Sequence, residues 1–507
     1  MALFIYNTLP RQKEEFKPIH EGHVGIYVCG PTVYSHSHIG HAKSYISFDV
    51  IVRYLRYLGY KVLYIQNITD VGHLTGDADE GEDKLDKQAR IDRVHPMQIA
   101  EMITRSYFED MDKLGIERPD ISPRASGHII EQIEIIKQLL TKGFAYEVNG
   151  SVYYDVQKFK NYGKLSGRVL EESIEGTRVE SRSEKRHPAD FALWKKAESG
   201  HIMHWPSPWG EGFPGWHIEC SAMSMKYLGE TFDIHGGGMD NQFPHHECEI
   251  AQSEAVTGKP FVKYWIHNNL VTVNGKKMSK SLGNFITLKD AFKKYDPLVV
   301  RFFILQSHYR STLDFSDEAL HGANTGYDKL LNTIRNLREE LKKAESEQRT
   351  NGTHIDISSY KKHFLNAMDD DFNAPLAIGV LFDLVRETNQ LLNSEHKFSI
   401  DTLQQIDQLF IELGGSILGI IPITCIYTAD GALTIKKQLI SATAIYTPPN
   451  RAMEDIESKL IGINIKIRQQ AKQEKAWWAA DLIRKELEAL GIRLEDKKDG
   501  TTWRKIN

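Results

Sequence analysis

The chain has 507 residues, of which 41% are hydrophobic and 26% are charged, and its net charge is −5. This length predicts several domains, and this composition excludes a disordered or membrane-embedded chain and gives no overall basic signature. Because no apolar run is long enough to span a bilayer and no signal peptide is apparent, we expect a cytoplasmic protein without a membrane partner. Four cysteines are too few for a disulfide scaffold and favour metal binding, catalysis or burial.

The segment 24–66 predicts a strand, a loop, a helix and a second strand. HVGIYV and KVLYIQ have the composition of strands, and AKSYISFDVIVRYLRYLG between them has helical spacing and ends at Gly59. This unit is the building block of a doubly wound parallel sheet, which binds ligands at the carboxyl ends of its strands. The loop from Cys29 to His41 is therefore expected at a ligand-binding edge.

Composition and hydrophobic pattern distinguish three further regions of the chain. Residues 96–200 mix helices and short strands, residues 201–284 are rich in Trp, Gly, His and Pro, and helical spacing dominates beyond 286. Apolar residues recur at this spacing in 288–306, 319–345 and 375–393, and a last small domain is expected to contain helices at about 452–473 and 477–490.

These patterns predict an α/β fold with a Rossmann-type, doubly wound parallel sheet and an insertion, followed by an α-helical bundle and a small mixed domain. The expected boundaries are 1–95 and 201–285 for the sheet domain, 96–200 for the insertion, 286–310 for a connecting segment, 311–424 for the bundle and 425–507 for the last domain.

The loop after the first strand contains the stretch HIGH, His38 to His41, where the predicted helix begins. A helix start offers free N–H groups and a positive dipole end, and two imidazoles can add donors to a phosphate. Gly40 would let a ligand approach the backbone closely. Four residues alone fit a capped helix with surface histidines equally well.

A second stretch, GKKMSKSLGN (275–284), carries Lys276, Lys277 and Lys280 between glycines. Lysines on a mobile loop can close over a polyphosphate and neutralise a leaving pyrophosphate. Such a loop is usually only a solvated turn, but together with HIGH it is a strong indication of chemistry on a nucleoside triphosphate.

A metal site is a further hypothesis. The stretch FPHHECEIAQSEA predicts a helix that places His245 and Glu249 one turn apart on one face. Thiolate and imidazole are the ligands that zinc favours, with carboxylate as a weaker partner. Cys29, Cys220, His245 and Glu249 could therefore form one site from three distant segments, although no local zinc pattern is present.

The two stretches HIGH and KMSKS resemble the signatures of the class I aminoacyl-tRNA synthetases. Further stretches narrow the resemblance to the cysteinyl-tRNA synthetase family over nearly the whole length. They are YVCGPTVY, RHPADFALWK, PSPWG, PGWHIECSAM, FDIHGGGMDNQFPHHE, DDDFNAPLAI and LEDKKDGTTWR. The resemblance implies activation of L-cysteine with ATP, transfer to tRNA(Cys), one zinc ion per subunit, Mg²⁺ with ATP, and a monomer.

The resemblance also implies roles for individual residues. The zinc ligands would be Cys29, Cys220, His245 and Glu249. Cys248 departs from the family pattern, and its place about 100° around the helix from Glu249 predicts that it faces elsewhere. ATP would contact Pro31, Thr32, His38, Ile39, Gly40 and His41 in the HIGH region, Lys277, Met278, Ser279, Lys280 and Ser281 in the KMSKS region, and Gly236, Gly237, Gly238 and Asp240 at the adenosine.

The substrate amino acid would lie in a pocket formed by Thr32, Trp216 and His235, whereas His36, His73 and His246 are expected to be structural or solvent-facing. Zinc would select cysteine over serine because it binds a thiolate readily and a hydroxyl poorly, whereas an apolar pocket separates such near-isosteres by only about 1–3 kcal/mol.

The carboxyl-terminal region would read the tRNA. By the same resemblance, segment 286–310 would contact the tRNA stem and the helical bundle would bind tRNA. Aromatic and polar side chains that suit unpaired bases make Asp496, Asp499, Trp503 and Arg504 candidates for anticodon contacts.

Two other functions share some of these features. A paralogous ligase that joins activated cysteine to an amino sugar would keep the zinc site and both signatures. It has no need of the helical region and the tail from 310 to 507, whose last part, 451–507, carries more basic than acidic residues. A non-catalytic, zinc-containing RNA-binding protein would have no need of intact HIGH and KMSKS stretches.

Overall fold

The computed structural model describes residues 2–72, 84–168, 184–278, 283–352, 356–394, 397–422, 484, 487, 492–497 and 500–505. The chain divides into two compact units, Met1–Ile426 and Tyr427–Asn507. Among the described residues, none of the helices combines the length and the apolarity needed to cross a membrane.

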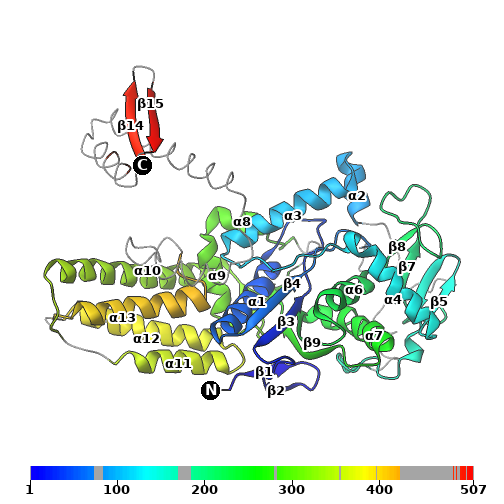
Figure 1. Cartoon of the computed structure of the whole chain (residues 1–507), viewed down its shortest axis with the longest axis horizontal. Coiled ribbons are helices and arrows are strands. Elements are labelled where there is room, and N and C mark those ends of the chain that lie inside the picture. Colours follow the sequence, from blue (N-terminus) through cyan, green and yellow to red (C-terminus); the bar gives the residue numbers. More distant parts are fainter. Residues whose placement is uncertain are drawn as a thin grey trace. The chain divides into compact units, whose positions relative to one another are not determined.

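The first unit is built on a parallel sheet with the strand order β10–β9–β3–β4 (Figure 1). The chain runs from β3 to β4 on one side and from β9 to β10 on the other, so the order reverses between β3 and β9. Such a reversal opens a crevice at the carboxyl ends of the strands. The predicted doubly wound fold is confirmed. The strands are β3 (His23–Val28), β4 (Lys61–Gln66), β9 (Phe232–Gly238) and β10 (Val262–Asn268).

Both faces of this sheet are covered, which explains why apolar side chains on both faces of its strands are buried. In β3, Ile26 and Val28 pack in the core that contains helix α1 (Ile39–Tyr57). The alternate residues Tyr27 and Cys29 pack in a second core on the other face. That core takes residues from α6 (Trp216–Leu228) and α7 (His245–Thr257).

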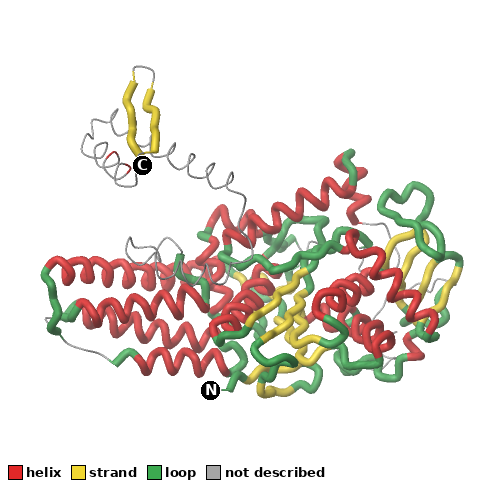
Figure 2. The backbone as a smooth tube through the Cα atoms, in the orientation of Figure 1, coloured by secondary structure: helices red, strands yellow, loops and turns green. Residues whose placement is uncertain are grey.

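Smaller elements surround the central sheet, and Figure 2 shows strands in several separate groups. An antiparallel sheet has the order β5–β6–β7–β8, two strands pair as β1–β2, and a third group has the order β12–β11–β13. The strands are β1 (Phe4–Asn7), β2 (Gln12–Glu15), β5 (Ala145–Val148), β6 (Ser151–Tyr154), β7 (Phe191–Lys196), β8 (Gly212–Pro214), β11 (Val271–Val273), β12 (Lys276–Lys277) and β13 (Leu313–Phe315). Helices α2 (Lys84–Asp92), α3 (Pro96–Lys113) and α4 (Ile129–Thr141) lie between β4 and β5 in the chain.

The helical pattern at 288–306 forms two helices rather than one. These are α8 (Leu288–Lys294) and α9 (Pro297–Leu305). The break falls before Pro297 because proline disfavours a helical residue before it and lacks the N–H that would continue the helix. Asp296 instead begins α9 as its N-cap and accepts a hydrogen bond from the Leu298 N–H at 2.8 Å.

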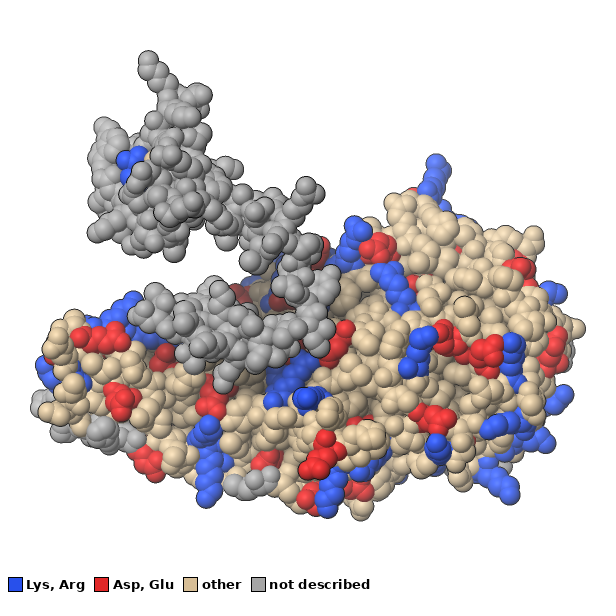
Figure 3. Space-filling view, viewed as in Figure 1, with Lys and Arg blue, Asp and Glu red and all other residues tan. Residues whose placement is uncertain are grey.

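The helical region beyond 310 is a bundle of long helices that lie side by side in Figures 1 and 2. It was predicted from helical spacing, and the structure has α10 (Asp317–Ser346), α11 (Ser358–Asp369), α12 (Ala374–Leu392) and α13 (Ile400–Phe410), with a π-helix at Ile411–Ile417. On the face of the first unit drawn in Figure 3, acidic and basic side chains are intermixed over the described residues. Charge on that face therefore does not single out a nucleic-acid surface.

The described part of the second unit is mainly a β-hairpin. Strands β14 (Ile492–Lys497) and β15 (Gly500–Lys505) pair antiparallel, with Leu494 opposite Trp503. The helix predicted at 452–473 lies outside the described residues. Of the helix predicted at 477–490, Arg484 and Leu487 are described, and both are helical.

Candidate active site

A cavity of about 580 Å³ opens at the carboxyl ends of β3 and β9, where the strand order reverses. It takes its walls from the loop after β3, the start of α1, the end of β9, and the segment that follows β10. The predicted site residues that line it are Cys29, Thr32, His38, Gly40, His41, Trp216, Cys220, Gly238, Asp240, His245 and Met278.

The loop that carries Cys29 is held close to the segment that follows β4. Gly30 donates a hydrogen bond from its N–H to the Asn67 side chain at 2.7 Å, and a Cβ at Gly30 would lie only 1.6 Å from the Asn67 carbonyl oxygen. Only glycine allows this approach. Thr32 continues the contact as a bridge partner of Thr69, so the loop is fixed beside the sheet.

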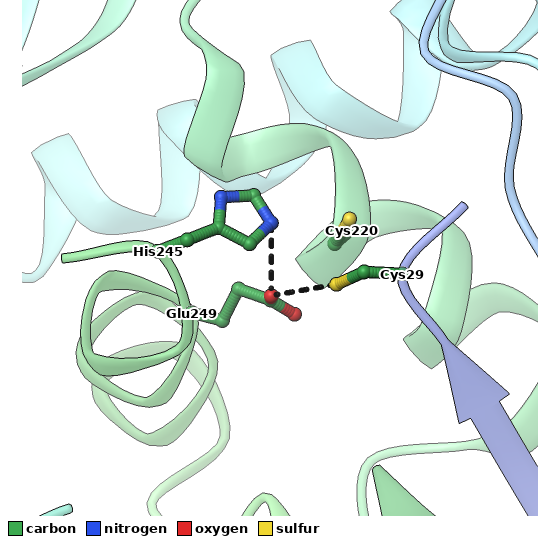
Figure 4. Close-up of side chains that lie close together, drawn as sticks. All are labelled: Cys29, Cys220, His245 and Glu249. Atoms are coloured by element: carbon green, nitrogen blue, oxygen red, sulfur yellow. Dashed lines mark hydrogen bonds and ion pairs between the residues drawn. The ribbon is translucent and has the colours of Figure 1, made fainter. Parts of the chain in front are cut away.

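Two thiols and an imidazole on the floor of the cavity meet the buried carboxylate of Glu249, which does not itself line the cavity. Figure 4 shows the side chains of Cys29, Cys220, His245 and Glu249 converging from three segments. Their ligand atoms all lie within 4.8 Å of one another, and all four residues are buried. Glu249 Oε1 lies 3.2 Å from His245 Nε2 and 3.9 Å from Cys29 Sγ. This grouping had been proposed from the ligand types, from the helical spacing of His245 and Glu249, and from the family resemblance.

These groups are costly to charge in the absence of a cation. Burial, with the neighbouring Cys220 thiol, raises the pKa of the Cys29 thiol well above its ordinary value. Burial likewise raises the pKa of Glu249, against the opposing effect of His235. A bound divalent cation would reverse this balance, because zinc ligands coordinate as thiolate and carboxylate. The donor set of two Cys, one His and one Glu fits Zn²⁺.

A chain of histidines lies behind this group. His235 Nε2 is 2.8 Å from Glu249 Oε2, and His246 Nε2 is 3.2 Å from Cys29 Sγ. His246 Nδ1 is in turn 2.8 Å from His267 Nε2, and burial lowers the pKa of His267 to about 3. Cys29, His235, His246 and Glu249 form a second group with metal-binding spacing. Since His235 and His246 are fully buried and do not line the cavity, they support the floor from behind.

The two histidines of HIGH use one ring nitrogen each to cap α1. His38 is the N-cap and accepts from the Gly40 N–H at 3.1 Å, while His41 Nδ1 accepts from the His38 N–H at 3.3 Å. A neutral ring that accepts at Nδ1 carries its hydrogen on Nε2. The enclosed position of His41, together with His38, holds the pKa of His41 well below its ordinary value. His41 is therefore a neutral donor at pH 7.

The lysine-rich stretch lies next to HIGH, although the two are about 240 residues apart in sequence. His38 forms a β-bridge with Thr287, the Ile39 N–H donates to the Ile286 carbonyl at 3.3 Å, and the Phe285 ring packs edge-on against His38. Met278 lines the cavity. Lys277 ends β12, while Ser279, Lys280 and Ser281 lie outside the described residues.

This geometry agrees with comparisons to known proteins. Residues 15–325 match the family of tRNA synthetases class I (C) catalytic domain, and residues 363–422 match the DALR domain. The chain is 52% identical over 511 residues to the cysteine–tRNA ligase of Chlorobaculum tepidum, which covers 99% of both chains. It is 47% identical over 504 residues to the cysteine–tRNA ligase of Thermus thermophilus, again over 99% of both chains.

The chain belongs to the cysteine–tRNA ligase family. A crystal structure of Mycobacterium tuberculosis methionyl-tRNA synthetase bound by methionyl-adenylate is similar in fold, with a TM-score of 0.58 and 15% identity. The match covers 79% of this chain and 92% of that one. The family and the class I fold, both expected from the signature motifs, are confirmed.

Within this member of the cysteine–tRNA ligase family, the three glycines after His235 have different surroundings. A Cβ at Gly236 would lie 2.2 Å from the Phe48 ring, and one at Gly237 would lie 2.9 Å from the His246 ring. These two glycines are buried against protein. Gly238 lines the cavity together with the exposed Asp240. The predicted adenosine contacts are therefore accessible at Gly238 and Asp240.

Of the remaining predicted positions, some line the cavity and others do not. Trp216 lines the cavity and stacks on the His245 ring at 4.4 Å between centroids, and Thr32 also lines it, whereas His235 does not. Pro31 and Ile39 are buried outside the cavity wall. His36 is exposed and lies 2.9 Å from the Ser106 hydroxyl.

Cys248 faces away from the metal-binding group, as its place on the helix predicted. It is packed in a different core and lies 3.4 Å from the Tyr162 hydroxyl. The anticodon candidates lie in the second unit: Asp496 is on β14, and Trp503 and Arg504 are on β15. Asp499 lies outside the described residues.

Sequence reasoning missed the part played by His246 and His267. It had expected His246 to be structural or solvent-facing, and the buried side chain agrees with a structural role, but its contact with Cys29 was not predicted. One signal was present: His267 is a polar residue near the end of the apolar strand VKYWIHN, at the ligand-binding edge of a parallel sheet. The pairing of β9 with β10 places it beside Gly237.

Proposed function

We propose that the chain is an ATP-dependent cysteine–tRNA ligase. It would convert L-cysteine and ATP to cysteinyl-adenylate and pyrophosphate, and then transfer cysteine to the 3′-terminal adenosine of tRNA(Cys). One observation supports this most directly. Three members of the group, the two thiols and the imidazole, line the same cavity as both histidines of HIGH and Met278 of the lysine-rich stretch, and the carboxylate lies within 4.8 Å of them.

Cys29, Cys220, His245 and Glu249 would hold one Zn²⁺ per subunit. The bound ion would supply selectivity, because it favours the thiolate of cysteine over the hydroxyl of serine. The chain's own contribution is to hold the four buried donors close together. His235 holds Glu249 Oε2 from behind, and Trp216 packs against His245 on the cavity side.

The first reaction needs little proton transfer, because the attacking group is the substrate carboxylate and the leaving group is pyrophosphate. The Nε2–H groups of His38 and His41 would donate to phosphate oxygens as charge develops. The positive end of the α1 dipole would add to this effect. Lys277 and Lys280 would neutralise the pyrophosphate, and Mg²⁺ would enter with ATP.

The second reaction requires tRNA, and the chain beyond the cavity is proposed to bind it. The DALR domain match at 363–422 supports a tRNA partner and disfavours an amino-sugar ligase. We assign stem contacts to 286–310, further tRNA contacts to 311–424, and the anticodon to 425–507, with Asp496, Asp499, Trp503 and Arg504 as candidates. The proposed setting is a cytoplasmic monomer.

The test is cysteine-dependent exchange between ATP and labelled pyrophosphate, followed by charging of a tRNA that bears a GCA anticodon. We expect exchange with cysteine, exchange at least about 100-fold slower with serine, and charging of the cognate tRNA. The control is the same tRNA with an altered anticodon.

The outcomes separate the candidate functions. Absence of exchange contradicts both enzyme functions and leaves the RNA-binding protein. Exchange without charging points to the amino-sugar ligase. Equal exchange with serine would contradict selection by a metal-bound thiolate.

A further inference from the structure

The turn between α11 and α12, at residues 369–373, docks on the sheet domain. Its sequence, DDDFN, is one of the stretches that resemble the family, but nothing in the proposed chemistry uses it. Asp371 and Phe372 both have left-handed backbones, with φ of +64° and +53°, and both are buried. Two adjacent non-glycine residues in this conformation are unfavourable unless surrounding contacts impose it.

The contacts that impose it come from outside the bundle. Asp371 Oδ1 accepts from the Tyr6 N–H at 2.8 Å and from the Tyr309 hydroxyl at 2.6 Å. Its Oδ2 accepts from Arg310 Nε at 2.7 Å. The Asp371 N–H donates to the Phe4 carbonyl in β1 at 2.9 Å. A single buried carboxylate of the bundle thus fixes the segment that connects α9 to β13.

That segment supports one wall of the active-site cavity. The Tyr309 carbonyl accepts from the Asn269 N–H at 2.9 Å, and the Arg310 carbonyl accepts from Asn269 Nδ2 at 2.9 Å. The Leu313 N–H donates to the Leu270 carbonyl at 3.1 Å. Asn269 and Leu270 both line the cavity. The wall after β10 is therefore held by residues 309–313.

The same segment also supports the strands from which the lysine-rich stretch emerges. Strand β13 pairs with β11, and β11 pairs with β12, which ends at Lys277. Asp314 Oδ1 accepts from the Thr272 hydroxyl at 2.6 Å and from the Gly275 N–H at 2.7 Å. Movement of residues 309–315 would shift both the cavity wall and the origin of this stretch.

A third connection reaches the helix of HIGH. Lys43, two residues after His41, is buried, and its ammonium group donates to the Leu270 carbonyl at 3.2 Å and to the Ser311 carbonyl. The cysteine-binding side differs, because Cys29, Cys220 and His245 come from the loop after β3, from α6 and from α7. Those elements make no contact with Asp371 in the hydrogen bonds of the described residues.

We propose that Asp371 is a positioning residue for ATP in amino-acid activation. Its carboxylate sets residues 309–315, and these set the wall after β10 and the origin of the lysine-rich stretch. The inference rests on the proposed activation of cysteine by ATP. It predicts different effects on the binding of the two substrates, because loosening this segment weakens the contacts of ATP and leaves those of cysteine in place.

The experiment measures cysteine-dependent pyrophosphate exchange for wild type, Asp371→Asn, Arg310→Gln and the double variant. Asp371→Asn keeps the size of the side chain but removes its charge. We expect KM for ATP to rise at least fivefold in each single variant, with KM for cysteine within twofold of wild type. In the double variant, KM for ATP should rise little more than in either single variant, because the two substitutions remove the same contact.

A matched control is Asp407→Asn. Asp407 is a partly buried carboxylate of the same bundle and pairs with Arg338 Nε at 2.7 Å, away from the segment 309–315. It should lower the thermal midpoint without changing KM for ATP. If Asp371→Asn fails to fold, Tyr309→Phe removes one donor to the same carboxylate and serves as the test.

Two results would overturn the inference. One is a lower thermal midpoint for Asp371→Asn with an unchanged KM for ATP, and the other is an equal rise of KM for ATP and cysteine. Either result would mean that the turn only docks the bundle. Absence of exchange in the wild type would instead contradict the proposed function itself.

Discussion

Cys220 and Cys248 lie on neighbouring helices, yet their thiols have different surroundings. Cys220, on α6, points to the group that contains Cys29 and Glu249, whereas Cys248, on α7, packs near the Tyr162 hydroxyl. Both are buried. The chemistry of each thiol thus follows from the face of the helix that carries it, and not from burial.

Substitution of Cys220 by serine should therefore reduce metal binding selectively. A serine hydroxyl is a poor replacement for a thiolate ligand, so we expect zinc affinity to fall at least about tenfold and cysteine-dependent exchange to fall with it. Zinc content after gel filtration and chelator competition measure the effect.

The control for this prediction is Cys248→Ser. It should keep one zinc per chain, even if the hydroxyl in an apolar core lowers stability. Equal zinc loss in the two variants would contradict the assignment of Cys220.

At the scale of elements, the position of α1 depends on the glycine in β9 that it covers. A Cβ at Gly236 would meet the Phe48 ring at 2.2 Å, which would push α1 away from the sheet. Because His38 is the N-cap of α1 and both HIGH histidines cap this helix, its position sets the direction of their Nε2–H groups. Packing behind the cavity wall therefore controls the phosphate donors.

Gly236→Ala should lower the free energy of unfolding by about 1–3 kcal/mol, the usual cost of overpacking a core. The same exchange at Gly379, inside α12 and facing open space, should raise it by about 0.5–1 kcal/mol, because alanine is the better helix former. Urea unfolding of both variants tests the contrast, and destabilisation by both would contradict it.

At the scale of the whole first unit, a buried arginine joins the sheet domain to the bundle. Arg301 of α9 is fully buried and pairs with Asp49 of α1. Its Nε donates to the Leu418 carbonyl beyond α13 at 2.9 Å, and Nη1 donates to the Leu114 carbonyl after α3 at 3.2 Å. Although burial alone raises the pKa of Asp49, the guanidinium groups of Arg53 and Arg301 hold it below its ordinary value.

Arg301→Gln should lower the free energy of unfolding by about 3–5 kcal/mol, because it leaves a buried carboxylate and several carbonyls without their donor. Arg301→Gln combined with Asp49→Asn should cost less than the sum of the two single changes. Additive losses in urea unfolding would contradict the pairing.

The matched surface change for this prediction is Arg386→Gln. Arg386 pairs with Asp383, and both side chains are exposed. The free energy of unfolding should therefore change by less than about 1 kcal/mol.

The sequence by itself determined the fold class, the family, the zinc-ligand candidates and the HIGH and KMSKS regions. The fold class follows from strand and helix periodicity, the pairing of His245 with Glu249 from helical spacing, and the family from the resemblance of short motifs. The break at Pro297 was also readable locally, because proline and its preceding aspartate act within one turn.

Only the tertiary structure decided which of these residues share a surface. Gly236 and Gly237 proved to be packed against protein while Gly238 faces the cavity, and His246 and His267 proved to support Cys29. Likewise, Asp371 contacts Tyr6 across 365 residues of chain. Contacts between such distant segments depend on how helices and strands pack in three dimensions, and spacing along the chain carries no record of that packing.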